Sequence, residues 1–314
     1  MKLAFVVDPL DDFKTYKDST FAMMREAQSR GAEIYSLQQE DIYWRKQRVA
    51  GNAMRIMLTG EKDVWYRAEP SAEIDLAKFD AVVMRKDPPF DMEYIYSTYL
   101  LEAAEKQGAR VYNKPRAIRD FNEKMAILRY AQFIAPTIVT RRENILREFL
   151  AEHGDIILKP LDGMGGTSIF RVHAGDHNIS VIIETLTHYG QRTIMAQRYI
   201  PEIRDGDKRV LLIGGKPVPY CLARIPKAGE TRGNLAAGGT GVARELTARD
   251  REIAETLAPL LYAEGLLLVG LDVIGANLTE VNVTSPTCFQ EIMQQTPCNV
   301  AGLFVDALEQ AITK

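Results

Sequence analysis

Residues 155–170 read DIILKPLDGMGGTSIF. The compact apolar run Ile156–Leu158 predicts a buried strand, and Pro160 stops it because proline has no backbone N–H for the ladder. Lys159 is therefore expected at the end of this strand, facing a cleft.

A glycine-rich loop follows the strand. Gly163, Gly165 and Gly166 permit positive φ and let backbone N–H groups approach a ligand closely. Such a loop suits an anion, most naturally a polyphosphate. Because the chain returns to a strand at Ser168–Phe170, the loop differs from Walker A and Rossmann loops, which open into a helix. An ordinary hairpin turn with a surface lysine is the alternative.

Length and charge exclude several classes of protein. The 314 residues predict about two or three domains. With 39 basic and 42 acidic residues, the formal charge is −3. The chain therefore lacks the global basic field of nucleic-acid or anionic-membrane binders, and neither partner is expected. Any anion site must be local.

Cysteine usage indicates a reducing compartment. Cys221, Cys288 and Cys298 are odd in number and form no CxxC pair, which argues against a disulfide framework and a structural zinc site. We expect them to be packing residues. The N-terminal KLAFVVDP is too short for a signal sequence, and no uncharged apolar run reaches membrane-spanning length. A soluble cytoplasmic protein is expected.

The first residues predict an α/β layer. Leu3–Val7 and Ala32–Leu37 are strand-like, and a helix between them begins with Asp18 or Ser19 as its N-cap. Strand, helix and strand in this order favour a parallel sheet. Further on, Met54–Leu58 is expected to form an antiparallel pair with residues 64–67.

The strand predicted at Asp80–Met84 ends in the polar run RKDPP, which begins with Arg85. Polar residues at the carboxyl end of an α/β strand commonly line a ligand crevice. The alternative is a solvated turn.

Residues 225–242 read IPKAGETRGNLAAGGTGV and contain five glycines with little bulky apolar content. The segment cannot form core, and segments of this length without structure of their own tend to be lids or disordered linkers. We predict a lid. A linker between domains is the alternative.

Residues 271–286, LDVIGANLTEVNVTSP, predict a hairpin. If residues 275–277 form a three-residue turn, Ile274 pairs with Leu278 and Asp272 lies opposite Glu280, with Asn282 on the same face. Two carboxylates and an amide oxygen this close favour a cation, and hard oxygen ligands suit Mg²⁺. A polar, exposed hairpin face is the alternative.

Several longer motifs carry a resemblance to a known family. They are MRKDPPFD, NKPRAIRDFNEK, DIILKPLDGMGG, DGDKRVL, PYCLARIP, GETRGNLAAGG and NVTSPT. In this order they resemble the bacterial glutathione synthase family of the ATP-grasp superfamily. The resemblance covers essentially the whole chain and is weakest at Asp41–Ala77, to which no role is transferred.

The resemblance implies an α/β fold, with an α+β C-terminal part. Residues 1–122 would form an N-terminal Rossmann-like, substrate-binding domain with a parallel sheet. An ATP-grasp domain of two α+β subdomains would follow, with the glycine-rich loop in residues 123–192 and the lid and metal-binding hairpin in residues 193–314.

It also implies where ATP binds. Lys124 and Lys159 would hold phosphates, the loop Gly163, Met164, Gly165, Gly166 would cover them through its N–H groups, and Asp207 would meet the ribose. The strand ending at Ile200 would read adenine, with Gln197, Tyr199 and Ile200 in the site. Asp272, Glu280 and Asn282 would hold Mg²⁺, with two ions accompanying ATP and Mn²⁺ as a substitute.

The implied reaction phosphorylates the cysteinyl carboxylate of γ-glutamylcysteine, which the amine of glycine then attacks. Arg209 and Arg224 would hold the transferred phosphate, although buried arginines that only pair with structural carboxylates are the alternative. The N–H near Gly166 would stabilise the oxyanion, and Arg232 on the lid would meet the acyl phosphate.

Arg85 and the helix start Lys17, Asp18, Ser19 would bind the carboxylates of the dipeptide, because helix N-termini favour anions. Thr284 and Ser285 of NVTSPT would also contact substrate. The resemblance further implies a homotetramer. Two alternatives stay open: a ligase for another peptide or protein carboxylate, and a non-enzymatic ATP-binding module.

Overall fold

The computed structural model describes residues 1–61, 64–230, 232–235 and 238–313. Its first sheet has the order β3-β4-β2-β1-β7-β8, with β5 and β6 paired to β4. The strands are β1 (Lys2–Val6), β2 (Glu33–Leu37), β3 (Ile42–Arg45), β4 (Arg48–Leu58), β5 (Tyr66–Ala68), β6 (Ala72–Asp75), β7 (Ala81–Met84) and β8 (Val111–Tyr112). β1 is parallel to β2 and β7, which confirms the predicted parallel core of the sheet.

The predicted antiparallel excursion is also present, because β4 pairs with β5 through Met57 and Arg67. The strand β5 begins at Tyr66, so residues 64 and 65 precede it.

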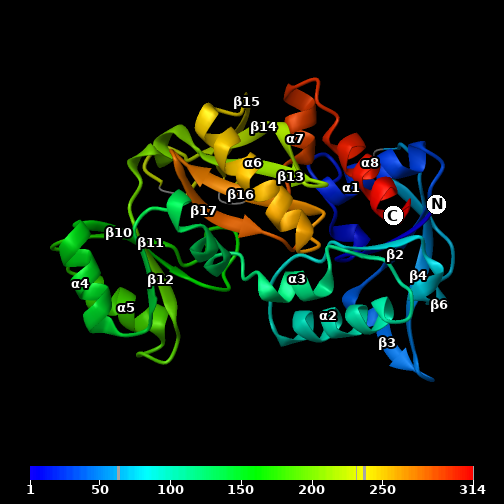
Figure 1. Cartoon of the computed structure of the whole chain (residues 1–314), viewed down its shortest axis with the longest axis horizontal. Helices are drawn as coiled ribbons and strands as arrows, with labels where there is room; N and C mark the ends of the chain where they lie inside the picture. The colour runs from blue at the N-terminus through cyan, green and yellow to red at the C-terminus, as the bar shows by residue number, and fades with distance from the viewer. Residues whose placement is uncertain (62–63, 231, 236–237, 314) are drawn as a thin grey trace.

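Helices cover both faces of the first sheet. Leu3 and Phe5 of β1 pack in one core with α1 (Ser19–Ser29) and the C-terminal α8 (Val300–Thr313). The alternate residues Ala4 and Val6 belong to the core on the other face, beneath α2 (Met92–Glu105). Figure 1 shows α1 and α8 on one side of the sheet and α2 with α3 (Pro115–Asp120) on the other.

The glycine-rich loop belongs to a separate four-stranded sheet of order β11-β10-β12-β9. Its elements are β9 (Thr137–Thr140), α4 (Glu143–His153), β10 (Asp155–Pro160), β11 (Phe170–His173), α5 (Ile179–Thr187) and β12 (Ile194–Arg198). β10 and β11 are antiparallel, so the loop joins two strands as predicted. The return strand starts at Phe170 rather than at Ser168, and Pro160 is the last residue of β10, paired with Ile194.

A five-stranded antiparallel sheet of order β15-β14-β13-β16-β17 forms the centre of the molecule (Figure 1). Its strands are β13 (Asp207–Ile213), β14 (Lys216–Ile225), β15 (Thr240–Glu245), β16 (Leu268–Ile274) and β17 (Asn277–Asn282). Helix α6 (Ala248–Ala263) packs on this sheet, and the 3₁₀ helix η4 (Met125–Phe133) lies beside β17. Helix α7 (Phe289–Gln295) follows β17 in the chain.

The β16–β17 hairpin corrects one predicted register. Its turn contains Gly275 and Ala276 alone, so Ile274 pairs with Asn277 and not with Leu278. A bulge after Asp272 then shifts the register by one residue, and Asp272 lies opposite Glu280 as predicted. No helix in the described parts of the chain has the length and apolar character needed to cross a bilayer.

Candidate active site

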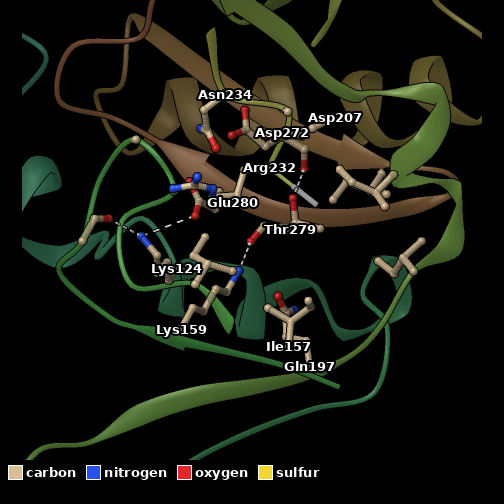
Figure 2. Close-up of a pocket in the computed structure, with 18 of the residues that line it drawn as sticks. Lys124, Ile157, Lys159, Gln197, Asp207, Arg232, Asn234, Asp272, Thr279 and Glu280 are labelled. Atoms are coloured by element: carbon tan, nitrogen blue, oxygen red, sulfur yellow. Dashed lines mark hydrogen bonds and ion pairs between the residues drawn. The ribbon is translucent and has the colours of Figure 1, made fainter. Parts of the chain in front are cut away.

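A cavity of about 110 Å³ lies between the four-stranded sheet and the five-stranded sheet. We call it the lysine cavity, because Lys124 and Lys159 line it. Figure 2 shows these two lysines on one side of the cavity and Asn234 and Asp272 on the opposite side. The cavity therefore brings together side chains from strands of two different sheets.

Both lysines are buried and face acidic groups. Lys159 donates a hydrogen bond from Nζ to the carbonyl oxygen of Thr279 at 3.2 Å. Burial lowers the pKa of Lys159 to about 8, although the negative charge of Glu280 opposes this effect. Lys124 donates from Nζ to the carbonyl oxygen of Gly163 at 2.5 Å and lies 3.4 Å from Glu280 Oε1. Two desolvated cations that line one cavity are suited to bind an anion of high charge.

The glycine-rich loop closes one side of the lysine cavity. Gly165 has φ +64° and Gly166 has φ +79°, the positive values that the sequence predicts. Gly163 does not have a positive φ; it is required for space, because a Cβ there would lie 3.0 Å from Pro160 Cγ. Met164 lines the cavity together with these glycines.

The part of the lysine cavity next to the end of β12 is lined mainly by apolar residues, and we call it the apolar slot. Tyr199 and Ile200 line it together with Ile157, Ile169, Ile203 and Ile274. Gln197 lines it as well and donates from Nε2 to Thr137 Oγ1 at 3.0 Å. Apolar walls beside the backbone groups of a strand end suit a heteroaromatic base.

Three buried charges and the partly buried Asp207 form one network beside the cavity. Arg209 donates from Nε to Asp272 Oδ1 at 2.5 Å and from Nη2 to Oδ2 at 3.2 Å. Arg224 Nη2 lies 2.8 Å from Asp272 Oδ2 and 2.5 Å from Asp207 Oδ2. Although burial alone would raise the pKa of Asp272, Arg209 and Arg224 lower it. The network thus keeps Asp272 charged.

Asp207 is the exception within this network. Burial, opposed by Arg224 and reinforced by the charge of Asp272, raises the pKa of Asp207 to about 7. Its Oδ1 is buried and has no hydrogen-bond partner within the described part of the chain. Because Asp207 lines the lysine cavity, this oxygen is available to a hydroxyl group of a ligand.

The predicted metal ligands lie on the β16–β17 hairpin. Asp272 faces Glu280 in the register, and Asn282 donates from Nδ2 to the carbonyl oxygen of Gly270 at 3.0 Å. No cluster of three His, Cys, Asp or Glu residues suited to a metal ion occurs within the described ranges. Mg²⁺ generally uses one or two carboxylates and completes its shell with water and phosphate oxygens. The donor set of the hairpin fits such a cation when a polyphosphate is present.

A second cavity, of about 210 Å³, adjoins the first. We call it the arginine cavity, because Arg209 and Arg224 line it. Met164, Gly165 and Asn234 line both cavities, so the two meet at the glycine-rich loop. The arginine cavity also includes Asn282, Thr284, Ser285 and Cys288.

The predicted lid lies where these cavities meet. Its residues 231, 236 and 237 are outside the described residues, and its end at 240–242 belongs to β15. Arg232 lines the lysine cavity. A Cβ on Gly166 would lie 2.7 Å from Asn234 Oδ1 and 3.2 Å from Arg232 Cδ, so the two loops are in close contact.

Some of the residues predicted to bind the dipeptide lie outside both cavities. Arg85 is buried, donates from Nε to Thr20 Oγ1 at 3.0 Å and from Nη2 to the carbonyl oxygen of Pro286 at 2.9 Å, and lines neither cavity. Arg85 Nη1 has no partner in the described ranges. Arg85 thus fixes the segment that follows β17.

The helix start at Lys17 also lies outside both cavities. Asp18 caps α1 by accepting from Phe21 N at 2.7 Å, and Ser19 Oγ accepts from Phe289 N at 3.2 Å. These groups are engaged in local structure. Their predicted role in substrate binding stays a prediction.

Two residues of the site were missed by the sequence analysis. Asn234 joins the two cavities, and Glu123 lines the arginine cavity while binding Thr284. Glu123 precedes Lys124 in a motif that was quoted for Lys124 alone. The available signal was its place directly before the predicted phosphate lysine.

Comparisons with known proteins agree with this arrangement. The model of the N-terminal domain of prokaryotic glutathione synthetase matches residues 1–119, and that of its ATP-grasp domain matches residues 123–297. The glutathione synthetase of Nitrosomonas europaea is 64% identical over 317 residues, covering 100% of this chain and 99% of the relative. That of Neisseria meningitidis serogroup A is 58% identical, covering 99% of each.

Solved structures share the fold at low identity. The D-cycloserine synthetase DcsG has a TM-score of 0.69 at 17% identity, covering 99% of this chain and 100% of the other. The ATP-grasp ligase PsnB, complexed with minimal precursor, Mg and ADP, has a TM-score of 0.63 at 18% identity, covering 99% and 98%. The fold is therefore the ATP-grasp fold, and the chain belongs to the prokaryotic glutathione synthetase family.

Proposed function

We propose that this chain, an ATP-dependent ligase of the glutathione synthetase family, joins γ-glutamylcysteine to glycine in the two adjoining cavities. The supporting observation is their shared wall. Met164, Gly165 and Asn234 border both the cavity with two buried lysines and the cavity with two buried arginines. A γ-phosphoryl group held by the lysines can thus reach a carboxylate beside the arginines without leaving the protein.

ATP would occupy the lysine cavity. Its adenine would lie in the apolar slot, and a ribose hydroxyl would donate to the unpaired Oδ1 of Asp207. Lys124 and Lys159 would bind phosphate oxygens as point charges, and the N–H groups of residues 163–166 would cover them. The protein thereby orients ATP and compensates its charge.

The family requires a divalent metal ion, and we propose Mg²⁺, with Mn²⁺ as a possible substitute. Asp272, Glu280 and Asn282 would hold it through oxygen atoms. Bound there, such an ion would supply positive charge that offsets the charge developing during phosphoryl transfer.

Phosphorylation turns the cysteinyl carboxylate into an acyl phosphate, which is a good electrophile. Arg209 and Arg224 would hold the transferred phosphoryl group, since guanidinium groups bind phosphate in a bidentate manner. The N–H of Gly166 would stabilise the oxyanion of the tetrahedral intermediate, and Arg232 would close over the acyl phosphate. Thr284 and Ser285 would contact the dipeptide from the arginine cavity.

The expectations on organisation remain proposals. We propose domain limits at residues 122/123 and 192/193, a homotetramer, and a cytoplasmic location. Light scattering coupled to size-exclusion chromatography measures the tetramer directly.

One experiment tests the activity. The purified protein is incubated with Mg-ATP and γ-glutamylcysteine, with and without glycine, and ADP and glutathione are measured. We expect continuous ADP release and glutathione formation with glycine, and no more than one ADP per site without it. Continuous ADP release without glutathione, or release with another peptide carboxylate only, would contradict the proposed substrates.

A further inference from the structure

Amide formation in the proposed reaction requires a proton acceptor. At neutral pH the amino group of glycine is an ammonium ion, which has no lone pair to attack an acyl carbon. The ammonium must lose one proton before attack and a second before the amide is complete. The second can leave with the departing phosphate, but the first needs a base within hydrogen-bond reach of the amine.

Glu123 has the position that this step needs. Glu123 lines the arginine cavity, as Arg209 and Arg224 do, and the acyl phosphate is proposed to lie in this cavity. Its Oε1 accepts hydrogen bonds from Val283 N at 2.9 Å, Thr284 N at 3.2 Å and Thr284 Oγ1 at 2.8 Å. These three donors fix the carboxylate.

The second oxygen of Glu123 is left for a ligand. Over residues 1–61, 64–230, 232–235 and 238–313, no hydrogen bond or ion pair to Oε2 is found. Burial, followed by the charge of Glu280, raises the pKa of Glu123, although the hydrogen bonds from Thr284 and Val283 oppose this effect. A raised pKa suits a group that must accept a proton near neutral pH.

The other carboxylates near the two cavities either are bound to other side chains or lie outside the arginine cavity. Asp87 also lines the arginine cavity, but it is exposed, and its Oδ1 accepts from Ser285 Oγ. Asp272 is held by two guanidinium groups, and Asp207 lies on the lysine side. Glu280 is paired with Lys124. Of the carboxylates that the structure places on the arginine cavity, Glu123 is thus the half-buried one, with an oxygen left for the amine of glycine.

We propose that Glu123 is the catalytic base for the amine of glycine, an inference that rests on the proposed function. Glu123 Oε2 accepts one N–H proton from the glycine ammonium, and the freed lone pair forms the N–C bond at the acyl carbon. The C–O bond to phosphate then breaks, and the remaining excess proton leaves with inorganic phosphate. Nothing is oxidised or reduced.

The test compares Glu123→Gln with the wild-type protein in separate partial reactions. The amide oxygen of Gln can still accept the three hydrogen bonds on Oε1, so the segment at Thr284 should stay in place. With Mg-ATP and γ-glutamylcysteine alone, we expect one ADP per site at a rate close to wild type. With glycine, we expect glutathione formation to slow at least about hundredfold, the usual range for loss of a general base.

Hydroxylamine distinguishes a base from a merely structural residue. It is already neutral near pH 7 and can attack the acyl phosphate without prior deprotonation. Glu123→Gln should therefore form the γ-glutamylcysteine hydroxamate at nearly the wild-type rate. As a matched control, Glu148→Gln neutralises an exposed carboxylate on α4 and should leave all rates unchanged.

Three outcomes would overturn the inference: glutathione formation by Glu123→Gln within a few-fold of wild type, equal losses with glycine and hydroxylamine, or loss of ADP formation. If the wild-type protein itself fails to form ADP with γ-glutamylcysteine, the proposed function fails instead. The two failures are thus distinguishable.

Discussion

Asp272 and Glu280 face each other across the β16–β17 hairpin, yet their carboxylates are paired with different cations. Asp272 binds Arg209 and Arg224, whereas Glu280 lies beside Lys124. Oδ1 of Asp272 accepts one hydrogen bond and keeps a free lone pair, so a cation bound there would share the carboxylate with the two arginines. Glu280 can bind a cation more easily, because Lys124 can pair with a phosphate of ATP in place of Glu280.

Substitution of Glu280 tests this assignment. Glu280→Gln removes one negative charge and nearly preserves shape, so we expect glutathione formation with Mg-ATP to fall at least about hundredfold. The melting temperature should change little, because the side chain is only partly buried. Wild-type turnover at ordinary Mg²⁺ concentration would remove Glu280 from the metal site.

Lys159→Met separates phosphate binding from packing. The substitution keeps an apolar stem and removes the charge, which should cost about 1.5–3 kcal/mol of ATP binding, as for other charge-assisted hydrogen bonds. The Kd for Mg-ATP in calorimetric titration should rise about ten- to hundredfold. Lys106→Met, at an exposed position on the surface, provides the control. Unchanged affinity in Lys159→Met would exclude a phosphate contact.

The pH dependence of ATP binding gives a second measurement on the same residue. With a pKa of about 8 in the ligand-free protein, Lys159 becomes neutral as the pH rises through 8, whereas the phosphate-bound lysine must be charged. Binding of Mg-ATP should therefore weaken progressively above pH 8 in the wild type. The decline should be absent in Lys159→Met, and the same decline in both proteins would assign it to another group.

The contact between the two loops can be tested with a pair of glycines. Gly165→Ala and Gly166→Ala both place alanine at positive φ, at a cost of about 1–2 kcal/mol each. Among the described residues, and apart from its chain neighbours, no heavy atom lies within 4 Å of the new Cβ at 165, whereas at 166 the Cβ meets Asn234 and Arg232. Turnover of Gly166→Ala should be lower by about tenfold or more, because misplaced loops disturb the reacting groups. Equal kcat values would show that the contact is unimportant.

Limited proteolysis tests closure of the lid. We expect trypsin to cut the free protein after Lys227 or Arg232, and Mg-ATP with γ-glutamylcysteine to suppress the cut. Arg232→Ala should lower turnover and increase ATP hydrolysis without product, because water would reach the acyl phosphate more easily. Cleavage that is equally slow with and without ligands would identify an ordered linker.

The hairpin shows how far sequence periodicity can predict a site. The alternation of β16 and β17 correctly places Asp272 opposite Glu280, but through a turn that is one residue too long. A bulge next to Asp272 compensates, and Thr279 takes up the register shift by donating from Oγ1 to the carbonyl oxygen of Asp272 at 3.1 Å. Polar residues fit either register, so the pattern could not reveal the bulge.

Contacts between distant segments were beyond the sequence. Arg85, at the carboxyl end of β7, donates hydrogen bonds to Thr20 and Pro286, which lie far from it in the chain, and its predicted contact with the dipeptide stays a prediction. Glu123 and Asn234 reach the cavities through packing partners far away in the chain. The sequence indicates that a buried charged residue requires a partner. Which residue becomes that partner depends on how the sheets pack against each other.

Helix α8 covers the same face of the first sheet as α1, and Phe304 and Leu308 share a core with Leu3 and Phe5. The ribosome therefore releases the opening strands long before the residues that shield them from water. During translation the part of this face that α8 covers stays exposed, and it is a surface on which unfinished chains can aggregate or chaperones can bind. A chain terminated before Val300 should consequently be degraded because its first sheet lacks the cover of α8, although every residue of that sheet is present.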